Sequence, residues 1–407
     1  MTIPYEFTPE VVQAHSPQNE QLYTAFLQNR DLEEPILGRN PWLLPPDQSK
    51  PLEWGTGRYW DTTVARKHDY WKQIDLPLPT KDIRRMRHDL REWGYCLIEE
   101  GLSDAQYQRL NTRLLEQAEG ERLAGIEQQS PYGQYVYSLI NKGECFAKCI
   151  EQDPEAVQAG PVIEQLMDET LGQGWICHAF LAHGADPDRW PQGLHVDQGA
   201  LLPWITKEAP VLVNTMFIIE DVNEVNGGTL IIPGSHKVMV AAVSGEPVDK
   251  LPPAINLEAR AGTIMVFDGR VLHGTGANRS SKRRFVLTMS NVKPWMRQQE
   301  VWLLSASPEV LEQASPKLLH RIGFQSLFNC GAVEGFGVNF AQGRVGEPEG
   351  ALKVFRDALD AGTYRRVGEL RPNSSEQDLQ MDFTLRKAMA GVTNQHSKKE
   401  AARDGTA

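Results

Sequence analysis

The stretch "VLVNTMFIIEDVNEVNGGTLIIPGSH", residues 211–236, contains two short apolar runs separated by a polar segment that ends in Asn-Gly-Gly. Runs of about four to eight apolar and β-branched residues bounded by turn residues are typical of buried strands. A glycine after an asparagine supplies the positive φ that a tight turn needs. The stretch therefore predicts two strands joined by a turn, the second of which ends at a Pro-Gly turn.

The same pattern of short apolar runs separated by turn residues continues on both sides, from about residue 175 to residue 292. It includes "WICHAFLAH" (175–183), "GTIMVFDGRVLHG" (262–274) and "RRFVLTMSNV" (283–292), with Gly, Pro and Asn between the runs. Short strands at roughly ten-residue spacing favour a β sandwich or barrel over a parallel α/β sheet.

Helical patterns flank this β-rich region. Ile83, Met86 and Leu90 recur at helical spacing, and "GYCLIEEG" (94–101) predicts a short strand. Ser103, with Asp104 after it, can cap the helix that follows. We therefore expect a mostly β core with flanking helices.

Four segments are expected along the chain. Residues 1–80 are rich in Pro, Trp and polar residues, which predicts an irregular N-terminal arm that could serve as a lid. Residues 81–295 would form the main β domain with its N-terminal helices. Residues 296–370 return to helical patterning, and residues 371–407 form a polar tail that is predicted to be flexible.

Composition excludes several classes of partner. The formal net charge of -11 argues against a nucleic-acid or anionic-membrane surface. No apolar run approaches the ~20 residues that span a bilayer, and the N-terminus lacks a basic and an apolar export region. Five cysteines in 407 residues do not form a disulfide framework, so a reducing, cytoplasmic location is expected. The oligomeric state stays open between monomer and homodimer.

Candidate metal ligands lie in "GLHVDQG" (193–199), where His195 and Asp197 are one residue apart. On a strand, residues i and i+2 face the same side, so both side chains could bind one object. The pair alone is a weak signal, but His273 in "VLHGTG" supplies a third candidate. Two imidazoles and one carboxylate, with other positions open, form the facial triad of non-haem Fe(II) oxygenases.

A 2-oxo acid that chelates such an iron presents a distal carboxylate, for which a guanidinium is the natural bidentate partner. Arg284, eleven residues after His273, begins a predicted strand, and the hydroxyl of Thr275 could bind the same carboxylate. The other cations of this cluster are expected at a solvated hairpin tip: Arg279, Lys282 and Arg283.

These motifs resemble those of the phytanoyl-CoA dioxygenase family of Fe(II)/2-oxoglutarate oxygenases. The resemblance rests on "HVDQG", "NGGTLIIPGSHK" (226–237) and "FDGRVLHGTGANRSSKRRFVLTMSN" (267–291), and "GYCLIEEGLSDAQYQRL" (94–110) is similar to the family's first strand and helix. It implies a double-stranded β-helix, that is, a cupin-like jelly roll.

By position, the resemblance makes His195, Asp197 and His273 the iron ligands and Thr275 and Arg284 the 2-oxoglutarate ligands, with O₂ as cosubstrate. Family members that halogenate carbon usually lack the carboxylate ligand. The presence of Asp197 therefore points away from halogenation.

Five further polar residues are candidates of lower rank. His178 and His183 are expected to satisfy a sheet edge, although either could face the pocket. His236 is expected to be a hydrogen-bonding loop residue rather than a fourth ligand. Gln134 and Asn214 are polar residues in apolar company, and either could touch 2-oxoglutarate.

The expected reaction is oxidation of an unactivated C–H bond in a small molecule such as a secondary metabolite, with release of succinate and CO₂. Hydroxylation is the default outcome, and desaturation or rearrangement can branch from it. An acyl-CoA substrate is the alternative within the family. A zinc hydrolase would leave Arg284 and Thr275 without a role, and a non-catalytic binding protein would not need the intact site.

Overall fold

The computed structural model describes residues 71, 73–130, 132–187, 189, 191–192, 194–198, 208–237, 240 and 254–324. The chain divides into two compact units, Met1–Gln313 and Ala314–Ala407. The described part of the second unit contains helix α13 (Pro316–Arg321), which Ser315 caps. The predicted tail over 371–407, nearly all of the predicted arm over 1–80 and much of the predicted extension over 296–370 lie outside the described residues.

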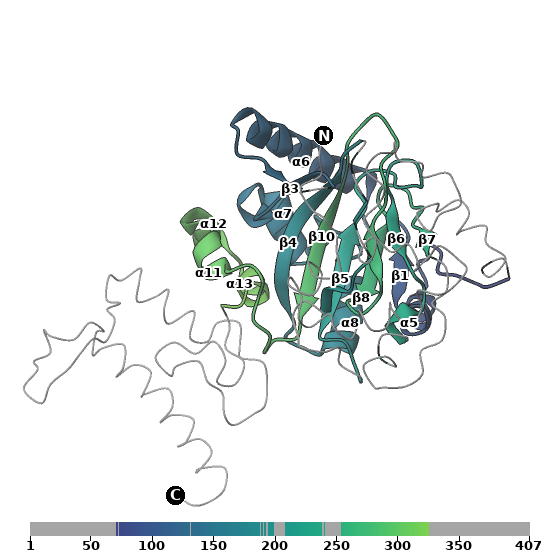
Figure 1. The fold of residues 1–407 in the computed structure, drawn as a ribbon. Coiled ribbons are helices and arrows are strands. Elements are labelled where there is room, and N and C mark those ends of the chain that lie inside the picture. Colours follow the sequence, from purple (N-terminus) through teal and green to yellow (C-terminus); the bar gives the residue numbers. More distant parts are fainter. Residues whose placement is uncertain are drawn as a thin grey trace, which may run out of the picture. The chain divides into compact units, whose positions relative to one another are not determined.

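The first unit is built on two antiparallel sheets (Figure 1). Among the described residues the larger sheet has the order β1 (Tyr95–Ile98), β8 (Ile264–Asp268), β5 (Leu212–Phe217), β10 (Arg284–Val292), β4 (Ile176–Ala185), β3 (Gln134–Val136) and β2 (Gln128–Gln129). The smaller sheet has the order β7 (Ile255–Asn256), β6 (Thr229–Ile231) and β9 (His273–Thr275). A single bridge between His195 and His273 adds the segment around His195 beside β9.

The order of these strands along the chain identifies the fold. From β4 onward the chain passes to the His195 segment of the small sheet, returns to β5, and then enters β6 and β7 of the small sheet. It continues through β8 of the large sheet and β9 of the small sheet to β10 of the large sheet. Eight segments shared between two sheets in this way form a jelly roll. The expected double-stranded β-helix is confirmed.

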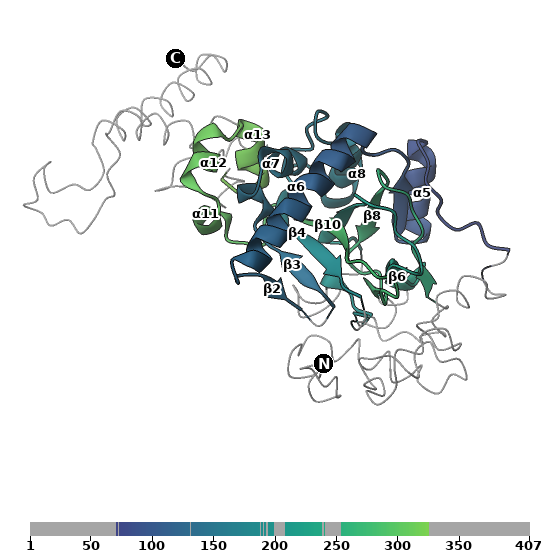
Figure 2. The same ribbon diagram turned by 90° about the horizontal axis from the view of Figure 1, so that it is seen from above.

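Helices cover the outer face of the large sheet (Figure 2). In chain order the first unit contains α5 (Ile83–Glu92), α6 (Asp104–Leu123), η2 (Leu139–Asn141), α7 (Glu144–Ile150), α8 (Gly160–Leu171), α11 (Trp302–Ser305) and α12 (Pro308–Gln313). As predicted, Ser103 caps α6: its hydroxyl accepts from the Gln106 N–H, and the Gln106 side chain accepts from the Ser103 N–H. In the described part of the chain, no helix combines the length and apolarity that crossing a membrane requires.

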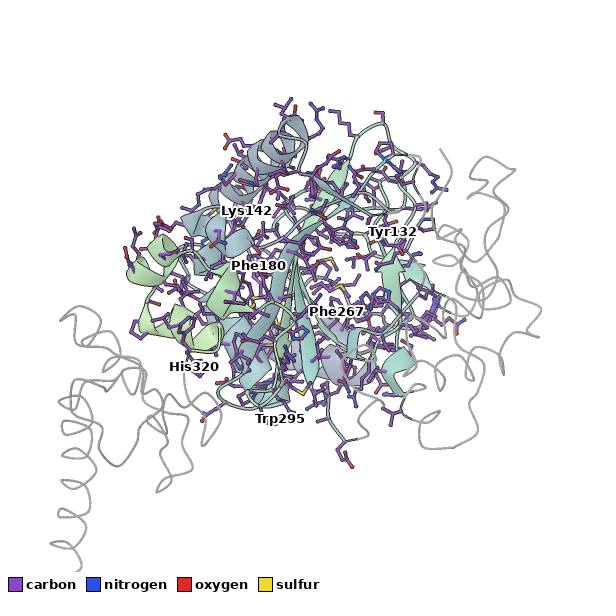
Figure 3. The ribbon with its side chains drawn as sticks, turned by 60° about the vertical axis from the view of Figure 1, so that its left-hand side comes forward. Tyr132, Lys142, Phe180, Phe267, Trp295 and His320 are labelled. Carbon is purple, nitrogen blue, oxygen red and sulfur yellow. The ribbon has the colours of Figure 1, made fainter. Side chains whose placement is uncertain are left out.

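Alternating side chains divide the large sheet into an outer and an inner face. Phe180 and Phe217 point outward, where their ring centroids are 5.9 Å apart and Phe146 of α7 lies 6.4 Å from Phe180. Phe267 and Val286 point inward and belong to the core between the two sheets. Figure 3 shows Phe180 toward the helices and Phe267 between the sheets.

Four inward positions of β4 and β10 are only half-buried: Leu181, His183, Thr288 and Ser290. Leu181 pairs with Thr288, and His183 and Ser290 each lie two residues along the same face from that pair. Every other residue of both strands is buried. The inner face of these two strands is therefore less tightly covered at these four positions than elsewhere.

Candidate active site

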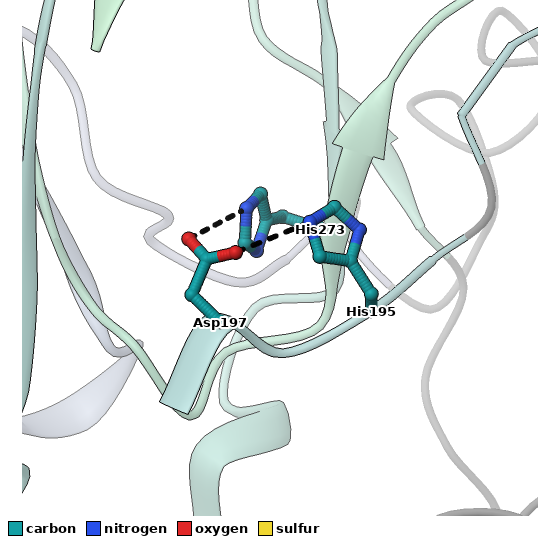
Figure 4. A group of neighbouring side chains, drawn as sticks. All are labelled: His195, Asp197 and His273. Atoms are coloured by element: carbon teal, nitrogen blue, oxygen red, sulfur yellow. Dashed lines mark ion pairs between the residues drawn. The ribbon is translucent and has the colours of Figure 1, made fainter. Parts of the chain in front are cut away.

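Three side chains converge at the edge of the small sheet (Figure 4). The His195 N–H donates to the His273 carbonyl at 2.9 Å and the His273 N–H donates back at 3.0 Å, so the backbone fixes both histidines. Asp197 Oδ1 lies 3.2 Å from His195 Nε2, and Asp197 Oδ2 lies 3.4 Å from His273 Nε2. One ligand atom of each residue lies within 4.8 Å of the other two. The structure thus brings the three predicted ligands together.

The local backbone differs from the expected strand. His195 occupies a single β-bridge, whereas Asp197 and Gln198 begin a helical turn. The Gln198 N–H donates to the Gly269 carbonyl at 2.9 Å, which holds this turn against the loop before β9. The prediction of a strand through Asp197 was wrong: the two side chains converge because the chain turns, and not because of strand alternation.

Hydrogen bonding and charge prepare the three groups for a cation. His273 Nδ1 donates to the Val271 carbonyl at 3.0 Å, which leaves the Nε2 lone pair toward the other two residues. Burial alone would raise the pKa of Asp197, but His273 and then His195 hold that pKa well below its usual range. Burial would lower the pKa of His273, and the charge of Asp197 raises it instead. An ionised carboxylate is the form that binds metal.

Asn214 and Ser290 support the carboxylate from the large sheet. Asn214 Nδ2 donates to Asp197 Oδ2 at 2.7 Å, and the Ser290 hydroxyl donates to Asn214 Oδ1 at 2.7 Å. The expectation that Asn214 could touch 2-oxoglutarate did not include this contact with Asp197. Its polar side chain inside the apolar run "VLVNTMF" was the available signal. For Ser290, no comparable feature of the sequence indicated a contact with Asn214.

Thr275 and Arg284 lie on adjoining parts of the two sheets. The Thr275 hydroxyl donates to Gln192 Oε1 at 3.2 Å and lies 3.4 Å from His183 Nδ1. Arg284 is only 2% exposed and donates to the backbone carbonyls of Asn226, at 3.4 Å, and of Gly227. Burial lowers the pKa of Arg284 to about 10, so the guanidinium stays charged at neutral pH.

The lower-ranked histidines have three different settings. The ring centroids of His183 and Tyr135 are 4.2 Å apart, and burial, with the nearby charge of Arg284, lowers the pKa of His183 to about 3. His183 therefore lies beside Thr275, one of the two predicted 2-oxoglutarate ligands, although a place at a sheet edge was expected for it. Burial lowers the pKa of His178 to about 4. His236 Nε2 lies 3.2 Å from the Arg91 carbonyl, which confirms the expected hydrogen bond, although His236 lies in a helical turn rather than in a loop.

The basic cluster is partly internal. Arg279 pairs with Glu224 at 2.9 Å. Arg283 is half-buried and pairs with Asp186, with 2.8 Å between Nη2 and Oδ2, and it also donates to Gln134. The prediction that Arg283 lies at a solvated hairpin tip was wrong, because Asp186, which follows β4, and Gln134 of β3 hold its guanidinium. Gln134 is buried and holds Arg283.

The fold and the converged triad define the class of non-haem iron oxygenases. The family model described as phytanoyl-CoA dioxygenase matches residues 90–286. Dioxygenase af480 of Aspergillus fumigatus is 30% identical over 239 residues, which cover 56% of this chain and 73% of that protein. The chain belongs to the phytanoyl-CoA dioxygenase family of non-haem Fe(II)/2-oxoglutarate dioxygenases.

Two solved structures are similar at low identity. HygX from Streptomyces hygroscopicus, with nickel and 2-oxoglutarate bound, is 14% identical with a TM-score of 0.41, covering 53% of this chain and 89% of HygX. SnoK, described as a non-heme alpha ketoglutarate dependent carbocyclase from nogalamycin biosynthesis, is 19% identical with a TM-score of 0.42, covering 57% of this chain and 92% of SnoK.

Proposed function

We propose that this dioxygenase holds Fe(II) with His195, Asp197 and His273, binds 2-oxoglutarate with Thr275 and Arg284, and hydroxylates a C–H bond of a neutral small molecule. The observation that carries the proposal is the convergence of two imidazoles and one carboxylate within 4.8 Å. The donor set fits a divalent iron, because nitrogen and carboxylate ligands on one side leave the other positions open.

Arg284 supports the assignment of 2-oxoglutarate. A guanidinium has five N–H donors, and the hydrogen bonds described for Arg284 are made to two backbone carbonyls. Further N–H groups are therefore available to a carboxylate in a buried place, where a charge-assisted pair is strong. Thr275 Oγ1 lies 3.4 Å from His183 Nδ1, and the charge of Arg284 contributes to the lowered pKa of His183.

Each group of residues has a separate task. Bound iron with 2-oxoglutarate would supply the oxidising chemistry, in which O₂ gives one atom to the substrate and one to succinate as CO₂ leaves. Asp197 contributes the negative charge, and the two histidines contribute neutral nitrogen ligands. His273 is oriented by its Nδ1–H, which donates to Val271. Arg284 orients and neutralises the distal carboxylate.

The settings of the basic residues favour a small neutral substrate over an acyl-CoA. An acyl-CoA needs cations for its phosphates, and the cluster at residues 278–284 was the one candidate in the sequence. Arg279 and Arg283 are instead held in ion pairs, and Arg284 is buried. A secondary metabolite whose reacting part is neutral fits these residues better than an acyl-CoA does. Desaturation or rearrangement could take place at the same site instead of hydroxylation.

The test is succinate formation from 2-oxoglutarate under air with Fe(II), measured alone and with a panel of neutral ring compounds and acyl-CoA thioesters. We expect slow formation without substrate and faster formation with a neutral compound, and none in His195→Ala or Asp197→Ala. Hydrolysis supported by Zn²⁺ with no 2-oxoglutarate consumption would contradict the proposal.

A further inference from the structure

The Ser290–Asn214–Asp197 chain crosses the two central strands of the large sheet to reach the triad. Ser290 of β10 and Asn214 of β5 are register partners, so the sheet itself sets the distance between them. The Asn214 side chain is fully buried, with an exposed fraction of 0%. A buried amide that makes two hydrogen bonds of 2.7 Å has little freedom to rotate.

The carboxylate of Asp197, which can only accept, fixes which end of the amide faces it, and the hydroxyl of Ser290 holds the other end by donating to it. Asn214 Oδ1 can only accept, and it accepts from the Ser290 hydroxyl. Asn214 Nδ2 can only donate, so it faces the carboxylate and donates to Oδ2. If the amide were reversed, its oxygen would face a carboxylate oxygen with no proton between them. The direction of the whole chain is therefore set by the donors and acceptors.

The consequence lies in how Asp197 can bind a cation. A carboxylate can bind a metal through one oxygen or through both. The Asn214 N–H occupies a lone pair of Oδ2 and partly neutralises its charge, whereas the closest described neighbour of Oδ1 in the triad is His195 Nε2 at 3.2 Å. Oδ1 is then the better ligand. Binding through one oxygen leaves a position that binding through both would occupy.

We propose that Asn214, oriented by Ser290, is a positioning residue that restricts Asp197 to metal binding through Oδ1 and so keeps open the positions that 2-oxoglutarate needs. The inference rests on the proposed iron site. In this proposal the small sheet and its loop supply the metal ligands. The large sheet, through Asn214, determines how many coordination positions of the metal stay free.

The experiment uses Co(II) as the probe, because it takes the same ligand types and its visible spectrum reports coordination number and geometry. The protein is titrated with Co(II), and the Co(II)-loaded protein is then titrated with 2-oxoglutarate. In Asn214→Ala we expect Co(II) to remain bound with a changed spectrum and the affinity for 2-oxoglutarate to fall by about tenfold or more. Ser290→Ala should change both readouts in the same direction by a smaller factor.

Two matched variants separate this role from general packing. Ser290→Thr keeps the hydroxyl and should restore the wild-type spectrum and 2-oxoglutarate affinity. Thr288→Val removes a hydroxyl from the same strand and the same half-buried inner face, two residues away, and should leave both readouts unchanged. Circular dichroism checks that each variant is folded.

The proposal is overturned if Asn214→Ala and Ser290→Ala keep the wild-type Co(II) spectrum and 2-oxoglutarate affinity. If Asn214→Ala does not fold or loses Co(II), the Co(II) spectra of Ser290→Ala and Ser290→Thr are compared instead. Different spectra support the proposal, and identical spectra overturn it. The proposed iron site itself fails if the wild-type protein binds no Co(II), or if His195→Ala binds Co(II) as well as the wild type does. Both results differ from those that overturn the role of Asn214.

Discussion

Arg284 is the residue on which the assignment of the cosubstrate depends most. Charge-assisted hydrogen bonds contribute about 1.5–3 kcal/mol, which corresponds to roughly a ten- to hundredfold change in binding. We therefore expect Arg284→Gln to raise the half-saturating concentration of 2-oxoglutarate by about that factor. Arg284→Lys should give a half-saturating concentration between those of the wild type and Arg284→Gln, because an ammonium keeps the charge but cannot make the two parallel hydrogen bonds of a guanidinium. The measurement is succinate formation as a function of 2-oxoglutarate concentration.

The matched control for Arg284 is Arg279→Gln in the same basic cluster. Arg279 pairs with Glu224 away from Thr275 and His183, so its replacement should leave the dependence on 2-oxoglutarate unchanged. Equal effects of the two substitutions would remove Arg284 from the cosubstrate site.

His178 gives a pH dependence whose sign follows from its burial. Burial lowers the pKa of His178 to about 4, whereas an unfolded chain has the ordinary value near ~6.5. Between these values the unfolded state binds more protons, so stability is lost as pH falls through this window and is fully present above it. Unfolding by urea at about pH 7 and about pH 5 should show the wild-type advantage over His178→Gln shrinking at the lower pH. If the wild type and His178→Gln differed in unfolding free energy by the same amount at both pH values, the lowered pKa of His178 would be contradicted.

At the scale of residues, sequence patterns predict the metal ligands because their types and spacing carry the chemistry. His195, Asp197 and His273 converge as expected. Ser290 was not assigned and His183 was expected at a sheet edge, because their partners depend on strand register. Ser290 lies opposite Asn214, 76 residues away in the chain. A serine at an inner position of β10 looks like any other polar residue until the register is known.

At the scale of elements, the outer aromatic layer attaches the helices to the large sheet. Phe180 is fully buried against Phe146 and Phe217. Phe180→Ala should lower the free energy of unfolding by about 3–5 kcal/mol, because it leaves a cavity under α7. The measurement is equilibrium urea unfolding. Leu115→Ala on the exposed side of α6, where Leu115 is 48% exposed, should change it by less than about 0.5 kcal/mol.

The same scale shows which elements a sequence can reveal. Long apolar runs predict β4, β5 and β10, and each forms. In the small sheet, β6 (Thr229–Ile231) was predicted from the run before Pro-Gly, whereas β7 (Ile255–Asn256) is too short to show a period. The turn at Asp197 was also missed, because its support comes from the carbonyl of Gly269, far along the chain.

At the scale of the whole molecule, the jelly roll joins two sheets at one site. The small sheet and its loop provide the triad, whereas the large sheet provides Asn214, His183 and Arg284. A cation that binds these separate segments only in the folded state stabilises the fold by linkage, about 2.7 kcal/mol at one hundred times its Kd. Co(II) should therefore raise the unfolding temperature of the wild type, and EDTA should reverse the rise.

Asp197→Ala is the control for this linkage. It removes the anionic ligand and its contact with Asn214, so the variant should unfold at the same temperature with Co(II) and with EDTA. A Co(II)-dependent rise of equal size in Asp197→Ala would place the stabilising cation elsewhere in the chain.

The most direct test of the central claim is an anaerobic optical titration of the purified protein with Fe(II) and then with 2-oxoglutarate. A 2-oxo acid chelated to iron gives a weak visible charge-transfer band, whereas either component alone does not. The proposed site predicts that the band appears with one equivalent of iron in the wild type and is absent in His195→Ala. The absence of a band in wild-type protein that has bound stoichiometric iron would contradict the proposed 2-oxoglutarate chemistry at this triad.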